Sequence, residues 1–184
     1  NSGIGLEAAK ILATAGADIV IACRNPAKAE SAVAEIDAAG DGVVDSVELD
    51  LSSMASVRAA AAEVRSRYDK LDGLVNNAGI MQTPETRTED GFELQLGTNH
   101  LGHFLFAGLL YDLVKAANGR ITVVSSIAHK LGEISLDDLM LESNYSPTRA
   151  YGQSKLANML FAQELSRRLE AAGSPVMANV CHPG

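Results

Sequence analysis

The sequence predicts an α/β fold in which a doubly wound parallel sheet lies between helices on both faces, giving three layers. Short runs rich in Val, Ile and Leu alternate along the chain with longer stretches that carry apolar residues every three or four positions. The first pattern is typical of strands buried on both faces, and the second is typical of amphipathic helices. Their alternation predicts repeated β-α units, which build a parallel sheet.

Length, composition and charge limit the classes of protein to which the chain can belong. The 184 residues are 47% hydrophobic and carry a formal net charge of -8. This length fits one domain, residues 1–184, and the hydrophobic fraction argues against a disordered chain. The acidic balance argues against nucleic-acid binding, because phosphates would be repelled. The net charge says little about small-molecule substrates, which bind at a local site.

Five short apolar runs predict the strands of the sheet. The clearest run lies between Gly16 and Asn25-Pro26 and reads DIVIAC. Runs of this length that are bounded by turn residues are typical of buried strands. The predicted strands span residues 18–23, 43–49, 71–75, 120–125 and 176–182.

Helical periodicity occupies the segments before and between these strands. Gly16 is expected to end the first helix, and Pro26 suits the first turn of the second. The longest predicted loop, 129–147, separates the last two helices. The predicted helices span residues 4–15, 26–39, 53–68, 89–117 and 148–172.

The cysteines, the apolar runs and the chain ends bear on the compartment. Cys23 and Cys181 lie far apart without neighbouring metal ligands, so we expect two buried thiols in a reducing cytoplasm and no metal site. The longest apolar run, 101–111, is shorter than the roughly 18 to 20 residues that span a bilayer, so no membrane segment is expected. Because the chain begins without Met inside a glycine loop, we expect a fragment truncated at both ends, which leaves an upstream membrane anchor open.

A glycine-rich segment opens the first predicted helix. Closely spaced glycines allow a phosphate to approach the backbone N–H groups at the positive end of a helix. A tight turn is the alternative interpretation of the same pattern. The candidate cofactor residues in this segment are Asn1, Ser2, Gly3, Ile4 and Gly5.

The end of the next strand indicates which cofactor is bound. In dinucleotide-binding folds an acidic residue about 20 positions after the glycines binds the ribose 2′-OH of NAD. Here the corresponding residues are Arg24 and Asn25, and no acid is present. Arg24 would pair with a 2′-phosphate, which favours NADP over NAD; a solvated loop arginine is the alternative.

Two asparagines and two small residues, Asn76, Asn77, Ala78 and Gly79, follow the predicted strand 71–75. Small residues allow the backbone to approach a ligand, and the amides could join neighbouring strands. An Asx turn is the alternative.

A tyrosine and a lysine indicate acid–base chemistry. Tyr151 and Lys155 are four residues apart on a predicted helix, and their face continues into Ala162 and Leu165. An inward-facing lysine needs partners, and a cofactor ribose and the tyrosine oxygen would provide them. A free tyrosine has a pKa of about 10, and a neighbouring ammonium lowers it by favouring the phenolate. A chance pair is the alternative, since many helices contain Tyr-x-x-x-Lys.

Two more polar residues occupy positions suited to a site. Ser126 follows the strand 120–125 beside Ser125, where a hydroxyl could hold a substrate oxygen or cap a helix. Asn99 lies on the apolar stripe of the long helix, so its amide needs partners, either a bound water or neighbouring core groups.

Taken in order, these motifs resemble the short-chain dehydrogenase/reductase family, a Rossmann-type fold. Residues 1–5 are similar to the end of its TGxxxGIG loop, and residues 76–79 to its NNAG motif. The resemblance implies that the catalytic set is Asn99, Ser126, Tyr151 and Lys155. It also implies cofactor contacts from Asp50 at the adenine, Leu51, Tyr151, Lys155 and the turn Pro183-Gly184.

Three stretches resemble one branch of the family more narrowly. DGFE at 90–93, NHLGHF at 99–104 and AYGQSKLAN at 150–158 are similar to retinol dehydrogenases and to the short-chain domain of the WW-domain oxidoreductase. The long stretch between Ser126 and Tyr151 also suits this branch. The resemblance implies NADP and a carbonyl or alcohol substrate, including lipophilic ones such as a retinoid or a steroid.

The resemblance implies a mechanism as well. Ser126 would polarise a ketone or aldehyde oxygen, Tyr151 would donate the proton, and Lys155 would lower the tyrosine pKa and hold the ribose. Asn99 would hold a water that resupplies the proton. Because the family's first strand is central and absent here, we expect these 184 residues alone to be poorly stable and a poor enzyme.

Three alternatives remain beside this interpretation. A sugar-nucleotide epimerase or dehydratase also uses Tyr-x-x-x-Lys, although the NNAG sequence argues against it. A non-catalytic NADP(H) sensor or scaffold would keep the glycine loop and lose catalytic residues, whereas all four are present here. A structural protein without a cofactor is the third. A homo-oligomer built through the two long helices is compatible with each.

Overall fold

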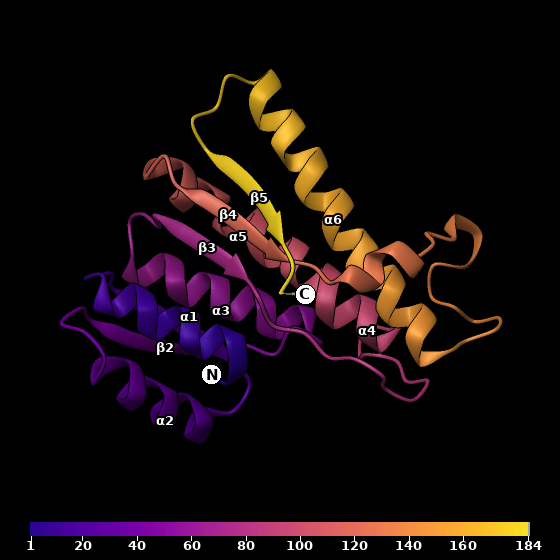
Figure 1. Cartoon of the computed structure of the whole chain (residues 1–184), viewed down its shortest axis with the longest axis horizontal. Helices are drawn as coiled ribbons and strands as arrows, with labels where there is room; N and C mark the ends of the chain where they lie inside the picture. The colour runs from indigo at the N-terminus through magenta and orange to yellow at the C-terminus, as the bar shows by residue number, and fades with distance from the viewer. Residues whose placement is uncertain (184) are drawn as a thin grey trace.

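The computed structural model describes residues 1–183, in which helices alternate with parallel strands (Figure 1). Its regular elements are α1 (Gly3–Thr14), β1 (Ile19–Cys23), α2 (Pro26–Asp37), β2 (Val44–Glu48), α3 (Met54–Arg67), β3 (Gly73–Asn76), α4 (Leu94–Leu96), α5 (Gly102–Ala116), β4 (Arg120–Val124), α6 (Pro147–Ala171) and β5 (Met177–Cys181). A π-helical turn η1 (Gly97–Leu101) joins α4 to α5, and two 3-10 helices, η2 (Ile127–Leu131) and η3 (Leu136–Asp138), lie between β4 and α6. The predicted α/β class with parallel strands and flanking helices is confirmed.

The described strands form two sheets instead of one continuous sheet. β1 pairs with β2 in the first sheet, and β3, β4 and β5 pair in that order in the second. Within residues 1–183, β1 and β3 each pair along one edge only, so both keep an edge of unpaired backbone groups.

Helices cover the two sheets differently. Alternate residues of β1 point to opposite sides, with Ile21 packed among α1 and α2 and Val20 packed toward α3. In the second sheet α5 and α6 cover one face, where Ile121 is buried. On the other face of this sheet Val75 is 51% exposed and Met177 is 47% exposed. The three-layer arrangement is therefore complete around β1 and β2 in the described part of the chain, but not around β3–β5.

The exposure of the two cysteines reflects how the helices cover the two sheets. Cys23 is buried, as expected, at the end of β1. Cys181 is exposed, and the prediction of a second buried thiol is wrong. The reason is that Cys181 lies two and four residues from the exposed positions of β5, on the sheet face that no described helix covers.

Capping side chains fix where several helices begin. Asn25 accepts a hydrogen bond from the Lys28 backbone N–H at 3.0 Å, directly before Pro26 opens α2. Ser53 and Ser146 cap α3 and α6 in the same way. The predicted boundaries of these three helices are therefore correct to within one or two residues.

The predicted helix 89–117 is wrong at its beginning. It starts only at Leu94, because both carboxylate oxygens of Glu93 accept backbone N–H groups, from Gln95 at 2.8 Å and from Leu96 at 2.6 Å. Upstream, Gly91 has a positive φ of 85° and closes a turn.

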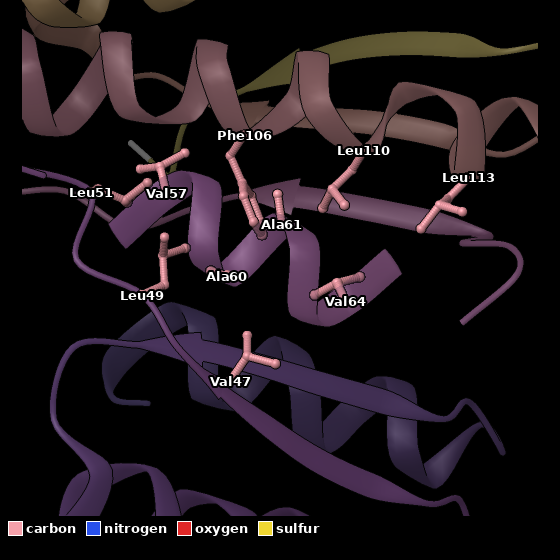
Figure 2. Close-up of a cluster of buried hydrophobic side chains, with 10 residues drawn as sticks. All are labelled: Val47, Leu49, Leu51, Val57, Ala60, Ala61, Val64, Phe106, Leu110 and Leu113. Carbon is pink, nitrogen blue, oxygen red and sulfur yellow. The ribbon is translucent and has the colours of Figure 1, made fainter. Parts of the chain in front are cut away.

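The largest core cluster lies between β2, α3 and α5 (Figure 2). Two adjacent alanines of α3, Ala60 and Ala61, are 1% exposed and allow α5 to approach closely. Phe106 and Leu110 project from α5 onto them, and burial of each such side chain contributes about 1.5 to 3 kcal/mol. This packing fixes α5 and the turn η1 that precedes it.

The predicted loop 129–147 is held to the body of the protein by hydrogen bonds. Arg87 donates to the Met140 carbonyl at 2.9 Å, and the buried Gln153 donates to the Leu139 carbonyl at 2.8 Å. The segment between β4 and α6 is thus ordered.

None of the helices within residues 1–183 is long and apolar enough to cross a membrane.

Candidate active site

The candidate catalytic residues come from elements that meet at one edge of the second sheet. Asn76–Gly79 and Ser126 lie at and after the carboxyl ends of β3 and β4, which are parallel neighbours. Tyr151 and Lys155 lie in the first turns of α6, and Asn99 lies in η1. The carboxyl edge of parallel strands is where α/β proteins of this kind bind ligands.

Lys155 is buried beside Tyr151. Only 4% of the lysine is exposed, and its Nζ donates to the Val124 carbonyl at 3.1 Å. The Nζ atom lies 5.7 Å from the centroid of the Tyr151 ring, and the tyrosine itself is half-buried. Burial lowers the pKa of the Lys155 ammonium, because the charged form loses hydration. The structure therefore brings together the two residues that the spacing of four predicted to share a face.

Asn99 is fully buried and uses its amide to join two segments. Its Oδ1 accepts the Ile80 backbone N–H at 2.8 Å, and its Nδ2 donates to the Ile80 carbonyl and the Ser154 hydroxyl, both at 2.9 Å. Both amide hydrogens thus have protein partners, and the backbone carbonyl of Asn99 also has one. The Nδ1 atom of the buried His103 lies 2.9 Å from that carbonyl.

Burial determines the charge state of His103. Only 4% of the residue is exposed, and this burial lowers the pKa of His103 to about 4. The imidazole is therefore neutral at pH 7, and Nδ1 carries the proton that it donates to the Asn99 carbonyl.

Two glycines allow neighbouring segments to pack closely at the edge of the site. A Cβ on Gly79 would lie 3.2 Å from Asn99 Oδ1 and 3.4 Å from Lys155 Nζ. A Cβ on Gly5 would lie 2.5 Å from Asn77 Nδ2, so the glycine loop and the segment after β3 lie against each other. The glycine loop and the segment 76–79, which are far apart in the sequence, thus form one surface.

The glycine loop leaves the start of α1 open. Ser2 precedes the helix in an extended conformation and makes no side-chain capping bond, and Gly3 has a positive φ of 54°. Asn1 and Ile4 are exposed beside them. Uncapped N–H groups at a helix start suit an anionic group.

Asn76 is the one site residue with an unmet hydrogen-bonding need. It is 1% exposed, yet neither its Oδ1 nor its Nδ2 has a partner among the described residues. A buried amide without partners costs about 1 to 3 kcal/mol for each unpaired group. The predicted tie between neighbouring strands is absent from residues 1–183.

Two glycines that no sequence motif marked pack η2, which follows Ser126, against α6, which contains Tyr151. A Cβ on Gly132 would overlap the Gly152 carbonyl oxygen, so η2 packs directly on α6. Ser126 opens η2, and its Oγ accepts only a long hydrogen bond of 3.3 Å from Ala128. The hydroxyl of the neighbouring Ser125 already has a partner, because its Oγ donates to the Lys155 carbonyl at 2.7 Å.

Arg24 and Asp50 lie at the ends of β1 and β2, on the other sheet. The arginine is 77% exposed and lies 4.0 Å from the Asp50 carboxylate. Asp50 also accepts hydrogen bonds from the backbone and hydroxyl of Ser52. Leu51 is buried in the core cluster, so only its backbone can face a ligand. Pro183 is exposed, and Gly184 lies outside the described residues.

The sequence as a whole matches one family. A family model for short chain dehydrogenases matches residues 1–184. The chain belongs to the short-chain dehydrogenase/reductase family. Within the family it is similar to mouse retinol dehydrogenase 14 (Mus musculus), with 47% identity over 196 residues, and to human retinol dehydrogenase 13 (Homo sapiens), with 47% identity over 189 residues. The resemblance to the retinol-dehydrogenase-like branch is thus confirmed.

These relatives are longer than the chain. All of the chain is covered in both alignments, and it spans 58% of the mouse protein and 56% of the human protein. A crystal structure of an uncharacterised protein from Mycobacterium paratuberculosis matches with a TM-score of 0.90 and 48% identity, covering all of this chain and 65% of that one. A metagenomic short-chain oxidoreductase solved with NADP matches with a TM-score of 0.78 and 26% identity, covering all of this chain and 78% of that one.

Proposed function

We propose that the protein containing this chain transfers a hydride between NADP(H) and a carbonyl or alcohol substrate. The observation that carries the proposal is the buried Lys155 ammonium 5.7 Å from the Tyr151 ring, at the carboxyl edge of the parallel sheet. A buried lysine with a lowered pKa beside a half-buried tyrosine is typical of a site that moves protons.

The residues present fit a nicotinamide dinucleotide. The open start of α1 suits the pyrophosphate, and Gly79 lets the segment after β3 pack closely against Lys155 and Asn99. Arg24 suits a 2′-phosphate, because its guanidinium is 77% exposed and holds Asp50 only at 4.0 Å. The relative solved with NADP supports the same choice. When bound, the cofactor supplies or accepts the hydride.

The chain's own residues would move the proton. Ser126, whose hydroxyl has only one long contact, donates a hydrogen bond to the substrate oxygen and orients it. Tyr151 donates its hydroxyl proton to that oxygen in the reduction and accepts it back in the oxidation. Lys155 stabilises the negative charge that develops on the tyrosine oxygen. Asn99 keeps the Gly79 segment and α6 at a fixed distance through Ile80 and Ser154.

A lipophilic substrate is the class that we favour. Met81 is 65% exposed and Ile127 is 51% exposed, and they follow Gly79 and Ser126 at the ends of β3 and β4. Apolar side chains next to the proposed oxygen-binding position suit an apolar substrate body. The retinol dehydrogenases named among the relatives support retinoids as the first compounds to test.

The test uses the full-length protein and a Tyr151→Phe variant. We expect tight NADPH binding, weaker NADH binding and turnover with retinal or another apolar aldehyde. The variant should lose about 10²- to 10⁴-fold in kcat, because it lacks the proton donor, and should bind NADPH within about twofold of the wild type. Retained turnover in the variant, or no binding of either cofactor, would overturn the proposal. Binding without turnover in the wild type would favour a sensor.

A further inference from the structure

Asn158 and His100 are polar residues near Lys155 that the proposed chemistry does not use. Asn158, one turn further along α6, is 1% exposed. Its Nδ2 donates to the Val124 carbonyl at 3.4 Å, and its Oδ1 lies 3.2 Å from Nδ1 of His100 in η1. The Val124 carbonyl is the same oxygen that accepts the Lys155 ammonium at 3.1 Å.

The Val124 carbonyl oxygen determines which atoms of Asn158 and His100 donate and which accept. A backbone carbonyl can only accept hydrogen bonds, so the Asn158 atom that faces Val124 must be the amide nitrogen. The amide oxygen therefore faces His100, and Nδ1 of His100 must carry a proton and donate it. A protonated ring would also carry a proton on Nδ1, so the hydrogen bond from His100 to Asn158 does not depend on the charge of His100.

Within residues 1–183, Asn158 is the only side chain that hydrogen-bonds to the His100 ring. Its ring lines an apolar cavity of about 650 Å³ between α5 and α6. The ring centroid lies 6.0 Å from that of Phe104 and 6.2 Å from that of Phe161. Burial lowers the pKa of His100, so the ring is neutral at pH 7.

A long lysine needs such a fixed acceptor. An unrestrained lysine side chain samples many rotamers, and immobilising it costs conformational entropy. The Val124 carbonyl ends β4, and the Asn158 amide holds it from a second direction. We propose that Asn158 and His100 are positioning residues that fix the Val124 carbonyl and, through it, the Lys155 ammonium. The catalytic consequence rests on the proposed function, whereas the positioning itself does not.

A matched pair of variants at His100 tests this inference in the full-length protein. His100→Asn places an amide N–H at the position of Nδ1 and keeps the donor, whereas His100→Phe fills the same apolar surroundings without it. The first measurement is the rate at which formaldehyde and borohydride methylate Lys155, followed by peptide mass spectrometry. We expect about a fivefold faster rate in His100→Phe, the size of one lost hydrogen bond, and a rate within about twofold of wild type in His100→Asn.

The second measurement is a double-mutant cycle on NADPH affinity. His100→Phe should weaken NADPH binding about fivefold in the wild-type background and have no effect in a Lys155→Met background, because it acts through Lys155. Equal methylation rates in the two His100 variants would overturn the inference, and so would a His100→Phe effect that persists without Lys155. If Tyr151→Phe retained turnover while the methylation rates differed as expected, the proposed function would fail and the positioning would stand.

Discussion

His103 shows how one buried side chain makes the protein sensitive to acid. Its ring is enclosed, and Nδ1 donates to the Asn99 carbonyl beside the proposed active site. The folded-state pKa is about 4, below the 6.5 of a free imidazole. The unfolded chain therefore binds the proton more readily than the folded one between pH 6.5 and pH 4, and proton binding in this window favours unfolding.

We predict a loss of stability over this window that depends on His103. Its contribution is fully present above pH 6.5 and falls by up to about 3 kcal/mol as the pH drops to 4. His103→Asn keeps an N–H at the Nδ1 position and cannot titrate. The measurement is the free energy of unfolding of both full-length proteins in urea between pH 7 and pH 4. Parallel curves for wild type and variant would contradict the prediction, whereas converging curves are expected.

At the residue scale, the sequence predicted contacts within one helix better than contacts between elements. Tyr151 and Lys155 could be paired because a spacing of four residues fixes their relation on any helix. The contact between His100 and Asn158 joins positions 58 residues apart and depends on how η1 packs on α6. The side chain of Asn99 was expected to bind either a water or neighbouring core groups, and its protein partners Ile80 and Ser154 could not be known before the fold.

At the element scale, η2, which follows Ser126, packs directly against α6, which contains Tyr151. Gly132 and Gly152 meet backbone to backbone, and a Cβ on Gly132 would overlap the Gly152 carbonyl oxygen. Gly152 directly follows Tyr151 in α6. Any displacement of η2 is therefore transmitted to the proposed oxygen-binding hydroxyl.

We predict that Gly132→Ala separates these elements. The variant should lose about 1 to 3 kcal/mol of stability from the forced shift, and about tenfold or more in kcat/KM because the reacting groups are misplaced. Gly108→Ala in α5 is the matched control, since a Cβ there has no atom within 4 Å. Thermal melts and steady-state kinetics of the full-length variants measure both effects. A Gly132→Ala enzyme that behaved like the Gly108→Ala enzyme would show that this contact does not position Ser126.

Element boundaries were predictable where a serine or asparagine cap precedes a proline and unpredictable where a less usual capping residue sets them. Asn25 and Ser146 lie directly before prolines and mark the starts of α2 and α6. The start of the long helix depends on Glu93, whose carboxylate caps α4 although the residue lies within an apparently continuous apolar stripe. The π turn η1 that follows gave no sequence signal of its own.

At the scale of the whole molecule, the class was predictable and the sheet pairing was not. Parallel pairing follows from the β-α alternation and is seen in all three strand pairs. Periodicity contains no information on which strands become neighbours, so the division into β1–β2 and β3–β4–β5 emerged only from the structure. The unpaired edges of β1 and β3 and the orphaned amide of Asn76 lie at this division.

These unpaired groups lead to a prediction for the 184 residues studied alone. Strand edges with unpaired N–H and C=O groups pair readily with other chains, and the exposed Val75 and Met177 add apolar surface to one of the two sheets. The chain expressed by itself should therefore associate at micromolar concentration and melt broadly and at lower temperature than the full-length protein. Analytical ultracentrifugation and calorimetry of both proteins at matched concentrations measure this difference. A monomeric chain with a sharp, cooperative melt and tight NADPH binding would show that the unpaired edges cost little, and that the packing around α3, α5 and α6 is sufficient for folding.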